Sequence, residues 1–182
     1  NGQRGVRMEP AEMAAKLAGI NSRYGVFVVL GRHDEWWEPA AVAAAFRRIG
    51  YRVLDGELAE IGLNSGQKLR ILGLKDHTTI GIWKNYSDTA RQLTGPTEGK
   101  GSLIALQHSP DVIGAITGPL AITSDPMILF AGHTHGGQLW LPVVGSPIVP
   151  SSYGQKFAAG HVQDSGIDVF VTTGIGTSIL PF

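Results

Sequence analysis

Apolar residues recur at helical spacing in two segments of the chain. Met13, Leu17 and Ile20 lie three or four positions apart behind Pro10, a residue that suits a first helical turn. Residues 38–50 show the same spacing, with two arginines in the last turn and glycine at the end. Both segments therefore predict helices with one buried face.

Short apolar runs rich in β-branched residues predict strands between and after these helices. Residues 24–31 form such a run and close with glycine, as a buried strand does. The segment 51–63 resembles a short hairpin around Asp55 and Gly56. Further strands are predicted at residues 68–76, 102–107, 126–131, 138–142, 156–162 and 167–176, with a helix that ends near Thr117 and another at 87–93.

The order of these elements predicts an α/β fold. Helices alternate with buried strands in the first half and strands dominate the second, which predicts mixed sheets with a more antiparallel second layer. With 182 residues, the chain is expected to form one domain, residues 1–182, and to bury roughly 70% of its unfolded surface.

Composition and charge exclude several classes of function. The formal net charge is zero and no basic run is longer than Arg47–Arg48, so bulk nucleic-acid binding is not expected. The absence of cysteine excludes disulfides and thiolate zinc sites. No run reaches the roughly 18–20 apolar residues of a membrane span.

The first residue is asparagine rather than methionine. We therefore expect that a leader or anchor can precede the chain. The predicted location is either cytoplasmic or, through such an upstream segment, membrane-associated or exported.

Polar clusters follow the predicted strands directly. In α/β sheets, ligands collect outside the carboxyl ends of the strands, so these clusters predict one functional rim. The clusters are Arg32-His33-Asp34, His108-Ser109-Pro110-Asp111, His133-Thr134-His135-Gly136-Gly137 and Ile175-Gly176-Thr177-Ser178, whereas His77 and His161 do not share this placement.

The pair His133 and His135 is the strongest signal for metal binding. On extended backbone, residues two apart point to the same side, so both imidazoles could face one ion. Gly136 and Gly137 remove bulk beside them and let backbone approach a ligand. For His108 taken alone, a hydrogen-bonded rim residue is preferred over a metal ligand.

Several other polar and aromatic residues keep alternative interpretations. Asp34 and Asp76 are each compatible with a ligand, a turn or a helix cap, and capping or dipole balance is preferred for Asp111 because it follows Pro110. The pair Trp36-Trp37 is compatible with core packing or with a hydrophobic lip, and core packing or partial burial is preferred. The Gly174–Gly176 stretch lacks the lysine of a phosphate loop.

With "GRHD", "LQHSPD" and "GHTHGGQ" in this order, the chain resembles the calcineurin-like metallophosphoesterase superfamily, and most of all its bacterial branch with the GHTHGGQ motif. The resemblance runs from about Gly25 to Pro181. It implies a four-layer α-β-β-α sandwich and two divalent ions, manganese, iron or zinc, about 3.5–4 Å apart. It also implies hydrolysis of phosphoric esters, monoesters or diesters, by a hydroxide that the two ions activate.

The resemblance assigns roles to residues by motif position. His108 and His133 would bind the second ion, and His135 the first. His33 would contact the phosphate and protonate the leaving oxygen. Gly136 and Gly137 would leave room for the ions and the phosphate.

Two departures from the family pattern stand out. Arg32 occupies the position of an asparagine ligand, and a guanidinium cannot donate a lone pair to a cation, although it can bind phosphate. The D-x-H and G-D-x-x-D motifs, which supply the remaining ligands, are absent from the chain. We therefore expect a domain trimmed at both ends, with its N-terminal part missing, weak or partial metal occupancy, and little activity of the chain alone.

The predicted function of the parent protein is that of a metal-dependent phosphoesterase with a small-molecule or lipid-linked phosphoester substrate. The alternative is a non-catalytic scaffold or interaction domain of the same fold with a partial metal site. A cupin-type H-x-H site is discounted, because Gly-Gly-Gln-Leu follows His135 where that site needs a nearby glutamate.

Overall fold

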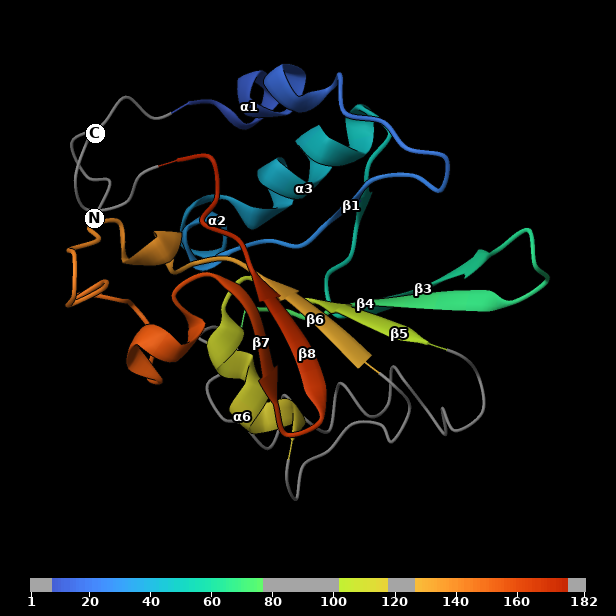
Figure 1. Ribbon diagram of the computed structural model, residues 1–182. Helices are drawn as coiled ribbons and strands as arrows, with labels where there is room; N and C mark the ends of the chain where they lie inside the picture. The colour runs from blue at the N-terminus through green and yellow to red at the C-terminus, as the bar shows by residue number, and fades with distance from the viewer. Residues whose placement is uncertain (1–7, 77–101, 118–126, 177–182) are drawn as a thin grey trace.

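The computed structural model describes residues 8–76, 102–117 and 127–176 (Figure 1). The main element is a six-stranded sheet in the order β3-β4-β5-β6-β8-β7. The pairs β4–β5, β5–β6 and β6–β8 are parallel, whereas the edge strands β3 and β7 pair antiparallel with β4 and β8. The strands are β3 (Glu57–Gly62), β4 (Lys68–Gly73), β5 (Leu103–Leu106), β6 (Met127–Ala131), β7 (Gly160–Asp164) and β8 (Ile167–Val171).

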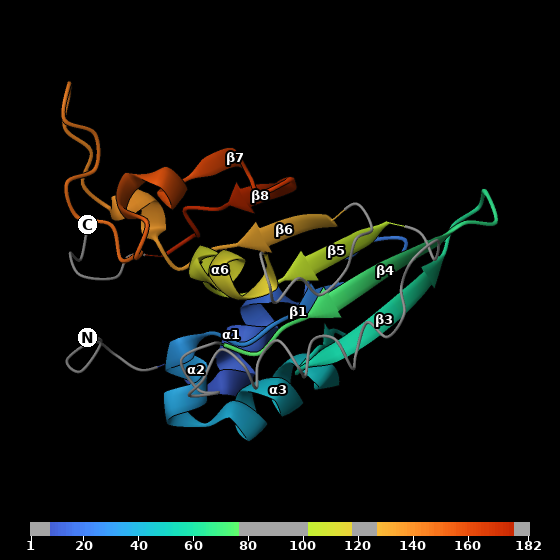
Figure 2. The same ribbon diagram turned by 90° about the horizontal axis from the view of Figure 1, so that it is seen from below.

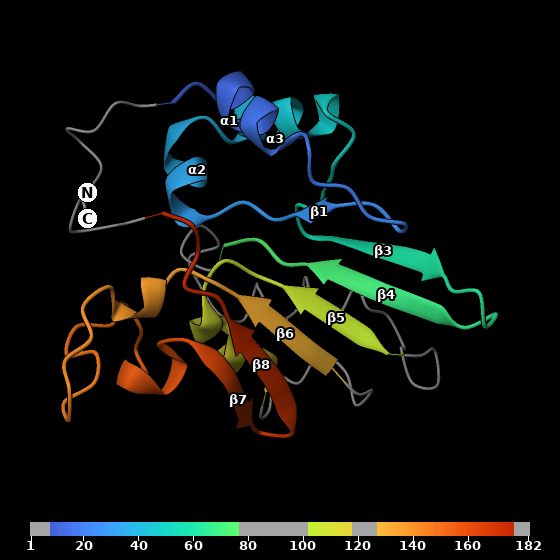
Figure 3. The same ribbon diagram turned by 45° about the horizontal axis from the view of Figure 1, so that its top comes forward.

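A second, two-stranded sheet lies against one face of the large sheet. It consists of β1 (Phe27–Val28) and β2 (Arg52–Val53), which run parallel. Two helices cover its far side, α1 (Pro10–Leu17) and α3 (Pro39–Arg48), and α2 (Arg32–Trp37) lies beside them beyond the end of β1 (Figure 3). The predicted helices in 10–20 and 38–50 are therefore present, and each has proline in its first turn.

The large sheet carries a hydrophobic core on both faces. On one face, Leu103, Leu129 and Val169 pack against α6 (Ile113–Ile116), which follows the 3-10 turn η1 (Pro110–Val112). On the other face, Ile71 and Ile104 pack against β1. Figure 1 shows α6 below the strands and the helices α1–α3 above them. The mixed α/β architecture predicted from the sequence is confirmed.

The predicted hairpin around Asp55 and Gly56 is wrong. Its first strand, β2, pairs with β1, whereas its second strand, β3, pairs with β4 in the other sheet. Leu54, which is buried between the sheets, donates its backbone N–H to Val28 at 2.9 Å before the chain crosses over. A local turn signal could not reveal this crossing, because β1, the partner of β2, is distant in sequence.

Three other predictions need correction. The second half is mostly parallel rather than antiparallel, since β5, β6 and β8 are parallel neighbours. The strand predicted after Gly137 is replaced by irregular chain with one isolated bridge between Leu141 and Gly145. The strand predicted at 156–162 is a 3-10 turn, η4 (Gly154–Phe157), followed by β7.

The strand predicted at 24–31 is only two residues long, and the helix α2 that follows was not predicted. The segment Arg32–Trp37 has no apolar periodicity, so its sequence gives no helical signal. Asp34 starts the helix by accepting the N–H of Gly31 at 2.9 Å. His77 and the helix predicted at 87–93 lie outside the described residues.

Candidate functional site

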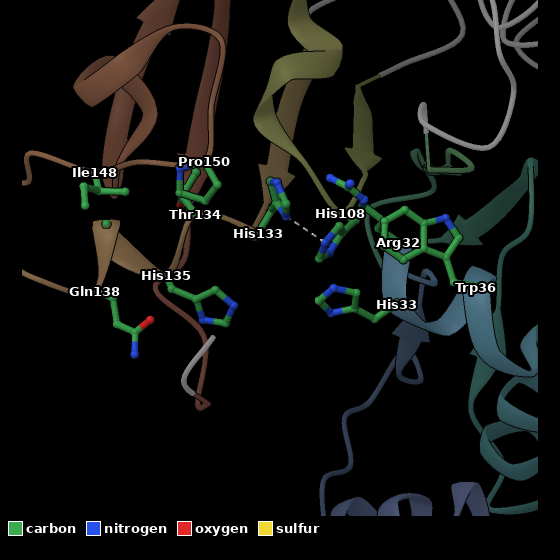
Figure 4. Close-up of a pocket in the computed structure, with 11 residues that line it drawn as sticks. Arg32, His33, Trp36, His108, His133, Thr134, His135, Gln138, Ile148 and Pro150 are labelled. Carbon is green, nitrogen blue, oxygen red and sulfur yellow. Dashed lines mark hydrogen bonds between the residues drawn. The ribbon is translucent and has the colours of Figure 1, made fainter. Parts of the chain in front are cut away.

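One cavity of about 320 Å³ collects the polar clusters found in the sequence. Figure 4 shows His133 and His108 joined by a dashed line, with His135 and His33 facing each other beside them. The structure thus brings together histidines that are up to 102 positions apart, and it leaves His161 on β7, away from the cavity. The lining residues are Arg32, His33, Trp36, His108, His133, Thr134, His135, Gly137, Gln138, Ile148 and Pro150.

His108 and His133 lie next to each other because each follows the carboxyl end of one of two adjacent parallel strands. β5 ends at Leu106 and β6 at Ala131, and the two strands pair in register. Beyond their ends the pairing continues, because the N–H of Gly132 donates to the carbonyl of His108 at 2.9 Å. His33 arrives from α2, which follows β1 of the two-stranded sheet, so the predicted functional rim is built from two sheets and not from one.

The backbone that carries His133 and His135 is a tight turn and not an extended segment. His133 has φ of 70° and His135 of 50°, both in the left-handed region that non-glycine residues rarely adopt. Such strain costs about 1–3 kcal/mol per residue and clusters at functional sites. The argument that extended backbone turns both imidazoles toward one ion is therefore wrong, and the turn aims the two rings separately.

The two rings have different partners. Nδ1 of His133 lies 3.1 Å from Nε2 of His108, so one of these nitrogens donates a hydrogen bond to the other. Nδ1 of His135 lies 3.1 Å from the carbonyl oxygen of Gly176, which fixes the ring tautomer because a carbonyl only accepts. The Gly174–Gly176 stretch, dismissed as a phosphate loop, thus orients a site histidine.

The two glycines after His135 serve loop packing. A side chain at Gly137 would meet Cβ of Ser146 at 2.5 Å, and the carbonyl of Gly136 accepts the hydroxyl of Ser146 at 2.7 Å. Gly137 lines the cavity and Gly136 does not. Their role in phosphate binding stays a prediction.

Arg32 lies where two cavities meet. Its guanidinium carbon is 4.3 Å from the ring centre of Trp36, and its buried Nε has no hydrogen-bond partner among the described residues. A second cavity, of about 480 Å³, begins on the other side of Arg32 and includes Asp76 and Asp111. The positively charged guanidinium of Arg32, which lies between the main cavity and these carboxylates, is well placed to bind an anion.

The remaining candidates are settled by their contacts. Asp111 accepts the hydroxyl of Ser151 at 2.5 Å and the N–H of Ser152 at 2.7 Å, so it holds a loop, and the helix cap predicted for it is supplied by Ser109. Trp36 is 60% exposed and forms a lip of the cavity, contrary to the preferred burial. Asp76 is buried and lines the second cavity.

The sequence is related to named proteins of three bacteria. It is 30% identical over 167 residues to the uncharacterized metallophosphoesterase YkuE of Bacillus subtilis (strain 168), a match that covers 91% of the chain and 54% of that protein. An uncharacterized metallophosphoesterase of Aquifex aeolicus is 31% identical over 166 residues, covering 91% and 58%. The uncharacterized metallophosphoesterase Cj0846 of Campylobacter jejuni is 29% identical over 127 residues, covering 69% and 31%.

The chain belongs to the metallophosphoesterase superfamily. It spans about half the length of the first two of these curated relatives. No family model matches the chain, and no solved structure gives a significant match.

Membership of the metallophosphoesterases implies divalent metal ions, and the histidine pair fits one of them in part. Ring nitrogens bound to one ion at about 2.1 Å and at about 90–110° to each other lie roughly 3.0–3.4 Å apart. The distance of 3.1 Å between His108 and His133 meets this condition. Within residues 8–76, 102–117 and 127–176, however, no group of three or more ligating side chains is close enough to hold an ion.

Burial keeps the ring of His108 neutral. Desolvation, and next the repulsion from His133, lower the pKa of His108 from 6.5 to about 4, against the attraction of Asp76. A neutral imidazole is the form that binds metal. The ring of His108 is therefore in its metal-binding form at mildly acidic pH.

We expect this pKa shift to make folding acid-sensitive between pH 6.5 and pH 4. The unfolded chain binds a proton at His108 near pH 6.5 and the folded chain only near pH 4, so stability falls as the pH drops through this window. From pH 7.5 to pH 5 the loss is about 2 kcal/mol. Urea unfolding in the presence of a chelator measures it. An equal loss in His108→Gln would contradict the assignment.

Proposed function

We propose that this chain supplies the histidine-bearing half of a phosphoester-hydrolysing site. The observation that carries the proposal is the convergence of His33, His108, His133 and His135, together with Arg32, on one cavity. Neutral imidazoles suit divalent ions, and a guanidinium suits the phosphate oxygens. The chemistry that fits this set is metal-dependent hydrolysis of phosphoric monoesters or diesters, as in the phosphoesterases to which the chain is related.

Each side chain has a role that fits its position. His108 and His133 would hold one ion and His135 would contribute to a second, and the bound ions would neutralise the phosphate and activate water. His33 is exposed at the cavity and would donate a proton to the leaving oxygen. Arg32 would bind the phosphate, since its Nε is buried and has no hydrogen-bond partner among the described residues.

We also propose that further strands extend the two-stranded sheet into the inner layer of a four-layer α-β-β-α sandwich. Phe130 and Phe170 support this: their rings stack 5.5 Å apart and both side chains are exposed. They lie on the face of the large sheet that packs against β1 further along, as their register with Leu106 indicates. Upstream polypeptide would cover them, in keeping with relatives nearly twice as long.

A non-catalytic scaffold is the second candidate. Arg32 replaces a ligand in the family motif, and the described residues hold no group of three ligating side chains. This alternative predicts a folded chain with weak metal affinity and no hydrolysis in any form.

The test is metal-dependent hydrolysis of p-nitrophenyl phosphate and of its bis-ester in Mn²⁺. The chain alone is expected to be inactive, because two cations held close together need a bridging carboxylate to offset their repulsion. A longer form with the upstream residues restored and Arg32→Asn is expected to turn over at least about 100-fold faster than the background, since an activated hydroxide and a general acid each supply such factors.

Two controls make this test decisive. In the longer form, His33→Ala should lower kcat about 100-fold by removing the proton donor, whereas His161→Ala, remote from the cavity, should not change it. Rapid metal-dependent turnover by the chain alone would refute the ligand assignment. Inactivity of the longer form would favour the non-catalytic scaffold over the hydrolase.

A further inference from the structure

The loop that follows the histidine turn exposes most of its large apolar side chains. We call residues 139–149 the apolar loop. Trp140 is 68% exposed, and the side chain of Val143 is fully exposed. Leu139, Leu141, Val144 and Ile148 are also exposed. An apolar cluster of this kind on one projecting segment marks a surface that is covered in use.

The apolar loop lies in a long stretch without charge. No Asp, Glu, Lys, Arg or His occurs from Gly136 to Gln155. The next cation, Lys156, is held by Asp164 at 2.9 Å. Whatever covers the loop is therefore recognised by apolar contact and not by charge.

The apolar loop is held in shape despite its exposure. Leu141 and Gly145 exchange both backbone hydrogen bonds, at 2.7 and 2.8 Å. The side chain of Gln155 accepts the N–H of Ser146 and donates to the carbonyl of Val144, both at 3.1 Å. Val143 at the tip has φ of 72°, a strained conformation for a β-branched residue. Folding stability explains neither this strain nor the exposed valine.

The apolar loop projects from the molecule beside the candidate site. In Figure 2 the orange segment after β6 extends away from the body at the left. Its base belongs to the cavity, because Gln138, Ile148 and Pro150 line it, and Figure 4 shows Ile148 and Pro150 on the same side as His135. Anything that receives the tip of the loop therefore lies next to the cavity mouth.

We propose that the apolar loop inserts its tip into the interface of a lipid bilayer and so places the cavity at the level of the headgroups. Trp140 and the aliphatic side chains around it are the residue types that enter this interface, and tryptophan prefers it. Resting on the proposed function, the substrate class is then phosphoesters that carry an acyl or isoprenoid chain. The phosphate of the substrate would face the histidines, and its acyl or isoprenoid chain would run along Ile148 into the lipid.

A bilayer fits the apolar loop better than a protein partner does. Protein interfaces combine an apolar centre with a polar and charged rim over a broad area. This loop is a narrow projection (Figure 2), and none of its own residues is charged. Docking needs no spanning segment, and no described helix of the chain could cross a membrane.

Co-sedimentation with phosphatidylcholine vesicles tests the docking directly. We expect the chain to bind, with little change when anionic phosphatidylglycerol or salt is added, because the loop carries no charge. The double variant Trp140→Ser, Val143→Ser should bind at least about tenfold more weakly, because two apolar side chains no longer leave water. Ile20→Ser, an equally apolar exposed side chain near α1, is the matched control and should bind like the unaltered chain.

Insertion of the loop into the bilayer is measured separately, by the quenching of tryptophan fluorescence by brominated phosphatidylcholine. We expect quenching in the unaltered chain and its loss in Trp140→Phe, which keeps the loop apolar. Vesicle-bound chain without quenching of Trp140 would overturn the proposal. So would the same weakening in Ile20→Ser, or a self-association that the double variant abolishes, which would assign the loop to a second copy of the chain.

The substrate class is tested separately in the active longer form. The double variant should lose hydrolysis of phosphatidic acid in vesicles and keep hydrolysis of p-nitrophenyl phosphate, because neither altered residue lines the cavity. Equal loss on both substrates would overturn the lipid assignment. Vesicle binding requires no turnover, so failure to dock and failure of the hydrolase proposal are distinguishable.

Discussion

Gly73→Ala is expected to destabilise the fold by about 3 kcal/mol. Gly73 ends β4, and a Cβ there would collide with Cβ of Leu54 and lie 2.8 Å from its carbonyl oxygen. Leu54 is buried and its backbone is tied to β1, so neither partner can turn away as a flexible side chain would. The two sheets would have to separate, and overpacking of this kind costs roughly 1–3 kcal/mol or more.

Gly62→Ala is the matched control for this prediction. Gly62 ends β3, the strand that pairs with β4, and no described residue has an atom within 4 Å of the position of its Cβ. Its replacement should change stability by no more than about 0.5 kcal/mol. Urea unfolding compares the two variants. Equal midpoints would mean that the sheets do not touch at Gly73, and the route by which α2 brings His33 to the cavity would have to be reconsidered.

The parts of the site predicted correctly from the sequence are those carried by regular strands. β5 and β6 are short apolar runs, and polar residues begin where each run ends. Parallel neighbours end at the same edge, so the meeting of His108 and His133 follows from local pattern and one topological rule. The order of the motifs pointed to the same family as the relatives found by comparison.

The parts predicted wrongly depend on contacts between distant segments. The chain leaves β2 for another sheet at Leu54, and only tertiary packing decides that step. Trp36 looks like a core residue by type, yet Arg32 lies over its ring at the cavity mouth. The turn at His133 and His135 is strained, and strain by definition departs from what local preference predicts.

The apolar loop illustrates a related limit of sequence analysis. The pattern of residues 138–142 predicts a strand, because a short apolar run usually means burial. Among the described residues, no neighbouring strand pairs with this segment beyond the bridge from Leu141 to Gly145. Composition alone cannot distinguish a side chain that is buried in the core from one exposed for a partner.

Gly31→Ala is expected to weaken Mn²⁺ or Zn²⁺ binding about 10- to 100-fold while leaving the fold nearly intact. A Cβ at this position would lie 2.7 Å from Nδ1 and 2.9 Å from Cε1 of His108. The φ of Gly31 is −102°, so alanine fits the backbone and only the imidazole has to move. Moving it takes Nε2 away from Nδ1 of His133, now 3.1 Å distant, and losing such support for a ligand typically costs this much affinity.

Calorimetric titration at pH 7 measures the loss of metal affinity in Gly31→Ala, and thermal unfolding in a chelator measures the change in stability. Gly19→Ala is the control, because in the described part of the chain nothing lies within 4 Å of a Cβ added there. His133→Ala sets the scale, since it removes one of the two nitrogens that can share an ion. Metal affinity unchanged in both Gly31→Ala and His133→Ala would show that the bound ion is not held by the His108–His133 pair. A loss in His133→Ala alone would show that the ring of His108 adjusts to a methyl group at Gly31 without leaving the ion.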